Sequence, residues 1–184
     1  MFVFGTFEIK GRTCKLVLPQ KNQAESLYKW IERDRKRLAK YLPWANSMLS
    51  SNDEEKFINY ALEKMLKGEM FVLTIIVDNE SVGMIDLHNI SKIHKRAEIG
   101  YWLASDFEGY GIITEAVKRL IIYSFNELEL NKVYIYADCA NTKSKAVAER
   151  LNFIHEAQLK EHIYDNGKFR DFDVYSLRKR DSKF

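Results

Sequence analysis

Two glycines separated by a single residue, Gly109 and Gly111, stand directly before a stretch of helical periodicity that begins at Ile112. The N–H groups of a helix's first turn have no partner within the helix, and they carry about half a positive charge. Glycine lets such a backbone adopt φ > 0 and come close to a ligand. The spacing therefore predicts either a phosphate cradle or a plain turn that starts a helix. Neither GxGxxG nor GxxxxGKS/T is present.

Charged residues around the two glycines act in opposite directions. Asp106 and Glu108 oppose an anion, so main-chain dipoles would have to outweigh them. Cations that could assist are Lys143, Lys145, Arg119 and Arg150. The longest basic cluster, RDRKRLAK at 33–40, has helical spacing and is interpreted as a solvated helix face. A patch for a nucleic acid or an acidic partner is the alternative interpretation of that cluster.

A second polar segment, NTKSKAVAERLNF at 141–153, follows the next strand-like run. Asn141 is a good N-cap for the helix that follows it. The segment also lies where a ligand would sit if two neighbouring parallel strands separated. Capping and ligand binding both remain open for Asn141.

Metal and disulfide chemistry find little support in the sequence. His88, His94, His155 and His162 have no spacing typical of a metal site, so we expect no metal. Cys14 and Cys139 lie far apart and match no disulfide framework, which fits a reducing compartment.

The elements that must position these residues alternate between helix and strand. Strands are predicted at 13–19, in two runs of 70–90 broken at 78–80, at 96–104, at 132–139 and from 153. Helices are predicted at 20–40, 50–68, 111–130 and after Asn141. The unit 98–139 is then a strand, a glycine turn, a helix and a strand, which is a parallel βαβ crossover.

Length and composition indicate one globular domain covering residues 1–184, of mixed α/β class. The 184 residues are 46% hydrophobic and carry a net charge of +3, which does not demand a nucleic-acid partner. No apolar run approaches the roughly 18 residues that span a bilayer, and residues 1–11 do not resemble a signal peptide. We expect a cytoplasmic protein that binds neither membrane nor nucleic acid directly.

The joint pattern resembles the Gcn5-related N-acetyltransferases (GNAT), and within them the RimJ/RimL-like protein acetyltransferases. The resemblance is nearly continuous from Ala97 to Ala157, and YLPW at 41–44 and YDNGKFRDFDVYSL at 164–177 extend it. It covers about residues 10–178. It implies a GNAT fold, in which a mostly antiparallel mixed sheet of about seven strands is splayed between two parallel strands and flanked by about four helices.

The resemblance also implies that acetyl-CoA lies in the splay. Its pyrophosphate would lie on the glycine loop, and its pantetheine arm would lie beside the strand at 102–104 like an added strand. The cosubstrate-binding residues implied are Trp102, Leu103, Ala104, Glu108, Gly109, Tyr110, Gly111, Ile112, Ile113, Thr114, Asn141, Lys143 and Lys145.

Two positions depart from the broad family pattern. The family loop is R/Q-x-x-G-x-G/A, whereas this chain has Glu108 at the first place and Ile113 at the last. Many members carry a tyrosine in the helix after the asparagine to protonate the leaving thiolate, and here that place is Ala148.

The candidates for the catalytic roles are Glu98 and Ser144. An amine must be neutral to attack a thioester, so a base acting through water is useful, and Glu98 beside the splay is the candidate. Strand alternation could instead turn Glu98 to solvent. A backbone N–H near Leu103 would suit the developing oxyanion. Ser144 resembles the subfamily serine that protonates the thiolate, although it could equally be a plain first-turn residue.

The predicted activity is direct acetyl transfer to a primary amine, most consistent with a protein's N-terminal α-amino group, as in ribosomal-protein acetyltransferases. A small amine is the alternative acceptor, and a non-catalytic acyl-CoA-binding module is the alternative class. A homodimer stays open. Residues suggested to line the acceptor side are Trp44, Asp86, His88 and Tyr164, with Trp30 and Tyr41 as further aromatic candidates.

Overall fold

The computed structural model describes residues 2–165 and 167–184. Its strands are β1 (Val3–Ile9), β2 (Arg12–Val17), β3 (Phe71–Val77), β4 (Glu80–Ser91), β5 (Arg96–Leu103), β6 (Lys132–Asp138), β7 (Ile154–Asp165) and β8 (Lys168–Arg178). Its helices are α1 (Ala24–Leu38), α2 (Ser51–Leu66), α3 (Ile112–Asn126) and α4 (Thr142–Arg150), with short 3-10 turns η1 (Lys21–Gln23), η2 (Pro43–Asn46), η3 (Ser105–Phe107) and η4 (Lys179–Asp181).

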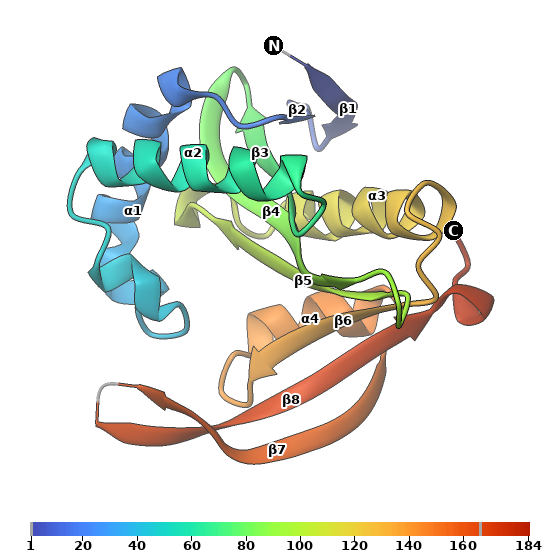
Figure 1. The fold of residues 1–184 in the computed structure, drawn as a ribbon. Helices are drawn as coiled ribbons and strands as arrows, with labels where there is room; N and C mark the ends of the chain where they lie inside the picture. Colours follow the sequence, from blue (N-terminus) through green and yellow to red (C-terminus); the bar gives the residue numbers. More distant parts are fainter. Residues whose placement is uncertain (1, 166) are drawn as a thin grey trace.

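The strands form one mixed sheet in the order β1-β2-β3-β4-β5-β6-β8-β7 (Figure 1). Neighbouring strands are antiparallel except for β5 and β6. The predicted mixed and mostly antiparallel sheet is confirmed, with eight strands in the described residues. The sequence reading predicted no strand for β1, which pairs with β2 through a turn where Lys10 and Gly11 have φ of 48° and 76°.

The parallel pair separates soon after it forms. Residues 96–98 of β5 pair with residues 132–134 of β6, and no further pair joins these two strands in the described chain. Figure 1 shows β5 and β6 diverging from this point. The remainder of β5 and the remainder of β6 therefore form the two edges of a gap, as the predicted splay requires.

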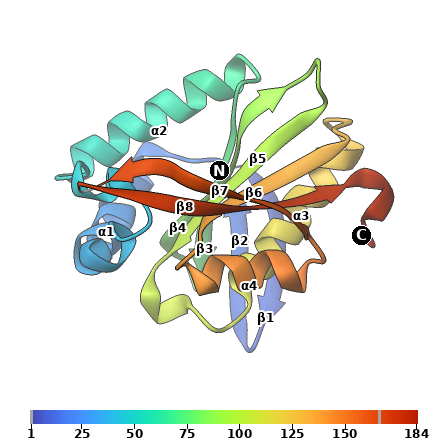
Figure 2. The same ribbon diagram turned by 90° about the horizontal axis from the view of Figure 1, so that it is seen from below.

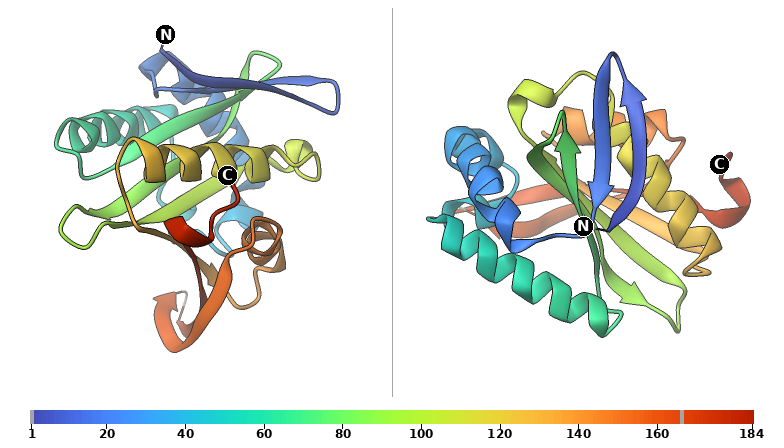
Figure 3. Two further views of the ribbon diagram at one scale, coloured as in Figure 1. Left: turned by 90° about the vertical axis from the view of Figure 1, so that its right-hand side faces the viewer. Right: turned by 90° about the horizontal axis from the view of Figure 1, so that it is seen from above.

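Helices cover both faces of the sheet. The helices α1 and α2 pack together and contact β4 and β3, whereas α3 and α4 pack against the opposite face. Views from above and below show this separation (Figures 2 and 3), and Figure 2 also shows the β7–β8 hairpin crossing beneath the other strands. In the described part of the chain, no helix is both long and apolar enough to cross a membrane.

The helix boundaries follow local signals in the sequence. The Ser50 side chain accepts a hydrogen bond from the Asp53 N–H and caps α2 as expected. The helix predicted at 111–130 is shorter, because α3 ends at Asn126 and the chain then turns with a φ of 50° at Glu129. Leu130 follows that turn and is buried in the core. The apolar periodicity of the sequence therefore extends beyond the end of the helix.

Candidate active site

The gap-facing edge of β5 is set by its pairing with β4. The N–H of Ala104 donates to the carbonyl of Val82 at 2.8 Å, so Ala104 uses its backbone within the sheet. Backbone groups alternate between the two sides of an antiparallel strand. The N–H and C=O of Tyr101 and Leu103 therefore face the gap. Of the three residues predicted to present their backbone there, only Leu103 does so.

A cluster of three charged side chains lies where the gap begins. His88 Nδ1 is 2.6 Å from Asp86 Oδ1, and His88 Nε2 is 3.2 Å from Glu98 Oε1. Asn89 Nδ2 donates to the second Glu98 oxygen at 3.1 Å. Burial by itself would lower the pKa of His88, but the hydrogen bonds to Asp86 and Glu98 outweigh it and raise that pKa to about 10. His88 is thus an imidazolium at neutral pH.

Gly100 makes room for this cluster. A Cβ at Gly100 would lie 2.9 Å from Asp86 Oδ2 and 3.2 Å from His88 Cε1, because Gly100 is the cross-strand partner of Asp86. A larger residue would displace the carboxylate that holds His88. Within residues 2–165 and 167–184, no group of three or more His, Cys, Asp or Glu side chains is arranged to hold a metal ion.

The aromatic residues predicted for the acceptor side divide into two groups. The Trp44 and Trp102 rings meet edge to face, with centroids 6.1 Å apart. Trp102 and Glu98 alternate onto the same face of β5, so Trp44 lies on the face that carries the charged cluster. Tyr164 is exposed in the β7–β8 hairpin and contacts Phe169 instead.

The opposite face of β5 presents a pair of hydroxyl groups. The Tyr101 hydroxyl lies 2.9 Å from Ser144 Oγ and 3.3 Å from the Ser144 carbonyl oxygen, so this contact joins β5 to the first turn of α4. Asn141 caps α4, because its side-chain oxygen accepts the Ser144 N–H at 3.1 Å. Burial raises the pKa of Tyr101 to about 12, although the hydrogen bond to Ser144 acts in the other direction.

The glycine loop takes the conformation that the sequence predicted. Gly109 and Gly111 have φ of 79° and 91°, and Gly111 is the N-cap of α3. The first N–H groups of α3 point out of the helix end without an intrahelical acceptor. A Cβ at Gly109 would meet nothing within 4 Å, so this part of the loop is open.

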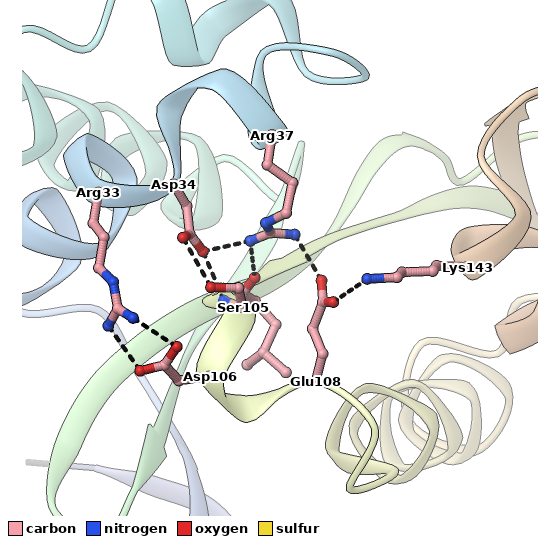
Figure 4. A network of polar contacts seen from close by, with 8 residues as sticks. Arg33, Asp34, Arg37, Ser105, Asp106, Glu108 and Lys143 are labelled. Atoms are coloured by element: carbon pink, nitrogen blue, oxygen red, sulfur yellow. Dashed lines mark hydrogen bonds and ion pairs between the residues drawn. The ribbon is translucent and has the colours of Figure 1, made fainter.

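A polar network joins the loop to α1, and Figure 4 shows its members. Asp34 of α1 is buried and accepts hydrogen bonds from the Ser105 N–H at 2.6 Å and the Ser105 hydroxyl at 2.9 Å. Arg37 donates to Asp34 at 2.6 Å and to the carbonyl of Leu103 at 2.8 Å. The end of β5 and the start of the loop are therefore anchored to α1.

The two acidic residues of the loop are each paired with cations. Glu108 contacts Arg37 at 2.6 Å and also forms an ion pair with Lys143 (Figure 4). Arg33 makes two hydrogen bonds, of 2.7 and 2.8 Å, to the carboxylate of Asp106. These pairs neutralise the negative charge that seemed to oppose an anion. The interpretation of 33–40 as a solvated face is thus wrong for Asp34, which is buried, and for Arg37, which is half-buried, whereas Arg33 is exposed.

The remaining predicted cations have partners of their own. Lys145 pairs with Asp173 at 2.8 Å, and Arg119 pairs with Glu115 at 3.0 Å. Arg150 donates to the Thr114 hydroxyl at 2.9 Å, which links α4 to the first turn of α3. Lys143 extends over the loop, and its side chain is largely exposed.

Sequence reasoning overlooked Asp34, Arg37, Ser105 and the contact of Tyr101 with Ser144. Strand alternation could have placed Tyr101 on the face opposite Glu98. No sequence signal could have joined Asp34 to Ser105, because this contact spans 71 residues and exists only once α1 packs against the end of β5.

A family model described as an acetyltransferase (GNAT) domain matches residues 15–154. The chain belongs to this family. Its splayed sheet and four helices are those of a GNAT acetyltransferase, and the predicted fold class is confirmed. The protein is accordingly an N-acetyltransferase.

Relatives of this GNAT acetyltransferase include ribosomal-protein enzymes. The chain is 39% identical to the "Putative ribosomal N-acetyltransferase YdaF" of Bacillus subtilis (strain 168), over 92% of each chain. It is 30% identical to the "Ribosomal-protein-serine acetyltransferase" of Escherichia coli (strain K12), covering 84% of this chain and 87% of that protein. It superposes with a TM-score of 0.85 on the Microcin C7 self-immunity acetyltransferase MccE in complex with acetyl-CoA and AMP, which is 28% identical and covers 90% and 92% of the two chains.

Proposed function

We propose that this GNAT enzyme transfers the acetyl group of acetyl-CoA directly to the α-amino group at the N-terminus of a protein, with ribosomal proteins as the acceptor class. The observation that carries the proposal is the placement of chemical groups around the gap. A carboxylate cluster lies on the α1/α2 face, and a hydroxyl pair lies on the α3/α4 face. The names of the two curated relatives support the acceptor class.

The loop fits the pyrophosphate of acetyl-CoA. Its glycines hold the backbone at positive φ, and the surface at Gly109 is open. The N–H groups of residues 109–114 would bind the phosphates, with Lys143 close by. The gap-facing backbone of Leu103 and the amide N–H₂ of Asn141 would contact the pantetheine arm. Acetyl-CoA supplies an activated thioester carbonyl at this place.

Three groups of the chain have separate roles in the proposed reaction, as base, as oxyanion donor and as acid. Glu98, held by His88 and Asn89, takes a proton from the acceptor amine through water, so that the nitrogen lone pair can attack. The Leu103 N–H faces the gap and donates to the carbonyl oxygen. The sulfur leaves with the electron pair of the broken C–S bond, and the Ser144 hydroxyl donates its proton to the sulfur and regains one from solvent.

The test measures thiol release from acetyl-CoA with a panel of N-terminal peptides, intact ribosomal proteins and polyamines. We expect turnover with protein N-termini, and mass spectrometry should place the acetyl group on the α-amine. Turnover with polyamines alone would replace the proposed acceptor with a small amine. Tight acetyl-CoA binding without thiol release would instead identify an acyl-CoA-binding module, and Glu98→Gln and Ser144→Ala would then leave function unchanged.

A further inference from the structure

Tyr101 is a half-buried residue whose hydroxyl the mechanism above does not use. Its hydroxyl lies 2.9 Å from Ser144 Oγ, and the two residues come from opposite edges of the gap, from β5 and from α4. Tyr101 is next to Trp102 in sequence but points to the opposite face of β5. It is therefore separated from the carboxylate cluster and adjacent to the serine assigned to the sulfur.

The number of protons in this pair limits what Ser144 can do. The Tyr101 hydroxyl has one proton and two acceptors in reach, the Ser144 carbonyl oxygen at 3.3 Å and Ser144 Oγ at 2.9 Å. If Tyr101 donates to the carbonyl oxygen, the Ser144 hydroxyl must donate its proton to the Tyr101 oxygen across the 2.9 Å contact. That proton is then not available to a ligand. If Tyr101 donates to Ser144 Oγ, the Ser144 proton is free to point into the gap.

We propose, on the basis of the function proposed above, that Tyr101 is a positioning residue that donates to Ser144 Oγ and so directs the Ser144 proton at the departing sulfur. A hydroxyl that accepts one hydrogen bond becomes a stronger donor in the next, which favours this direction of the chain. The pKa of Tyr101, raised to about 12 by burial, keeps its proton in place at neutral pH. The buried residue one turn further along α4, Ala148, has no polar side-chain atom to take the same role.

The experiment measures the acidity of CoA while it is bound. The thiolate of CoA absorbs in the ultraviolet, so the pKa of the bound thiol can be titrated on wild type, Tyr101→Phe, Ser144→Ala and the double variant. Loss of one hydrogen bond to the thiolate should raise the pKa of the bound thiol by about half a unit to one unit in each single variant. The pKa of the bound thiol in the double variant should be close to that in each single variant, because both residues act through one chain of hydrogen bonds.

Turnover gives a second measurement. Tyr101→Phe should lower kcat by about tenfold with little change in the Kd of acetyl-CoA. Its rate should also depend more steeply on the leaving thiol when thioesters of thiols with different pKa values are compared. The matched control is Tyr123→Phe, which removes the same atom from a tyrosine whose ring stacks on Phe71, and it should match wild type throughout.

Each outcome decides the proposal. The role of Tyr101 would be overturned by an unchanged thiol pKa in Tyr101→Phe, or by a thiol pKa in the double variant that rises by the sum of the two single shifts. Either outcome would leave the proposed function intact. CoA that fails to bind the wild-type protein would overturn both. Should Tyr101→Phe fail to fold, Ser144→Ala in the half-exposed first turn of α4 reports the same thiol pKa, and an unchanged value there would reject the chain of hydrogen bonds.

Discussion

Glu98 lies where β5 and β6 separate, and both of its carboxylate oxygens have a hydrogen-bond partner. His88 contacts one oxygen and Asn89 contacts the other. Strand alternation could have turned Glu98 to open solvent, but the structure does not show this. The Glu98 side chain is 24% exposed and has a partner at each carboxylate oxygen. An oriented carboxylate at the mouth of the gap suits a base that works through one water.

Glu98→Gln keeps the shape of the side chain but removes its ability to take a proton. We expect kcat/KM to fall about 100-fold at neutral pH, and the acidic limb of the pH–rate profile should disappear. The measurement is kcat/KM across pH with the best acceptor of the panel. Glu129→Gln, at an exposed turn after α3, is the control. A variant profile with the wild-type acidic limb would rule out Glu98 as the base.

Gly111 combines a φ of 91° with the N-cap position of α3. Gly111→Val should abolish measurable acetyl-CoA binding in calorimetry, because a β-branched residue opposes this backbone conformation and its Cβ would lie 3.2 Å from Ile9 Cδ1. Gly68→Val is the matched control, since Gly68 has a φ of 69° at the end of α2 and meets only the flexible Lys92 side chain. The control should lower Tm and retain binding. Equal binding by both variants would contradict the assignment of the loop.

At the scale of elements, α1 supports the loop as well as the core. One helical surface of α1 packs against β4, and the neighbouring residues Arg33, Asp34 and Arg37 reach the loop that follows β5. Helix periodicity brings Arg37 to the same side as the other two, because it follows Asp34 by three positions and Arg33 by four. The helix thereby fixes the end of β5 and the beginning of the loop as one unit.

Asp34→Asn should destabilise this unit. Burial alone would raise the pKa of Asp34, but hydrogen bonds from Arg37 and Ser105 outweigh it and lower that pKa. The resulting stability is present above the ordinary Asp pKa of about 4 and is lost as pH falls through the lower folded value. Urea unfolding should thus show that Asp34→Asn lowers the free energy of unfolding by about 2 kcal/mol at pH 7. This difference should become smaller in acid. The exposed Glu25→Gln on the same helix is the control, and a loss that does not change with pH would contradict the charge argument.

Glu108→Gln tests how the loop balances its charges. The substitution releases Arg37 and Lys143 from one carboxylate, so both cations become more available to phosphates. We expect the Kd of acetyl-CoA by calorimetry to be equal to the wild-type value or lower. Lys143→Gln should raise the Kd. Weaker binding by Glu108→Gln would mean that the Arg37–Glu108–Lys143 bridge itself shapes the site.

For the molecule as a whole, the splayed sheet separates two chemistries. The cluster of Asp86, His88 and Glu98 lies with Trp44 and Trp102 on one face, and Tyr101 and Ser144 lie on the other. Groups of both faces lie near the gap between β5 and β6. We therefore expect that binding of the acceptor and binding of the donor can be altered independently.

Trp44→Ala should affect the acceptor alone. Removing the Trp44 ring from its edge-to-face contact with Trp102 is expected to raise the KM of the acceptor about tenfold. The Kd of acetyl-CoA should stay at the wild-type value, since Trp44 packs on a side chain of β5, whereas the glycine loop lies beyond the C-terminal end of that strand. Steady-state kinetics and calorimetry together measure the two quantities, and Trp44→Phe should restore most of the loss. A changed Kd would contradict the separation into two faces.

Local patterns were enough to predict most elements of this fold. Apolar periodicity and caps predicted four helices, and β-rich runs predicted β2 to β7, whereas the segment of β8 entered only through the resemblance at 164–177. The edge strand β1 was not predicted, because an exposed edge strand carries few fully buried residues; Phe7 is the buried residue within Val3–Ile9. The splay itself came from resemblance, since pairing between β5 and β6 is a property of two segments far apart in sequence.

The sequence by itself determined the glycine loop, the cap at Asn141 and the presence of Glu98 on a strand, because each depends on residues within a few positions of one another. Only the tertiary structure decided which groups surround them. It paired Glu108 with Arg37 and Lys143, enclosed His88 between two carboxylates, and brought Tyr101 to Ser144 across the gap. Hydrogen bonds and ion pairs act over a few ångströms, so partners distant in sequence become defined only when the packed sheet and helices bring them together.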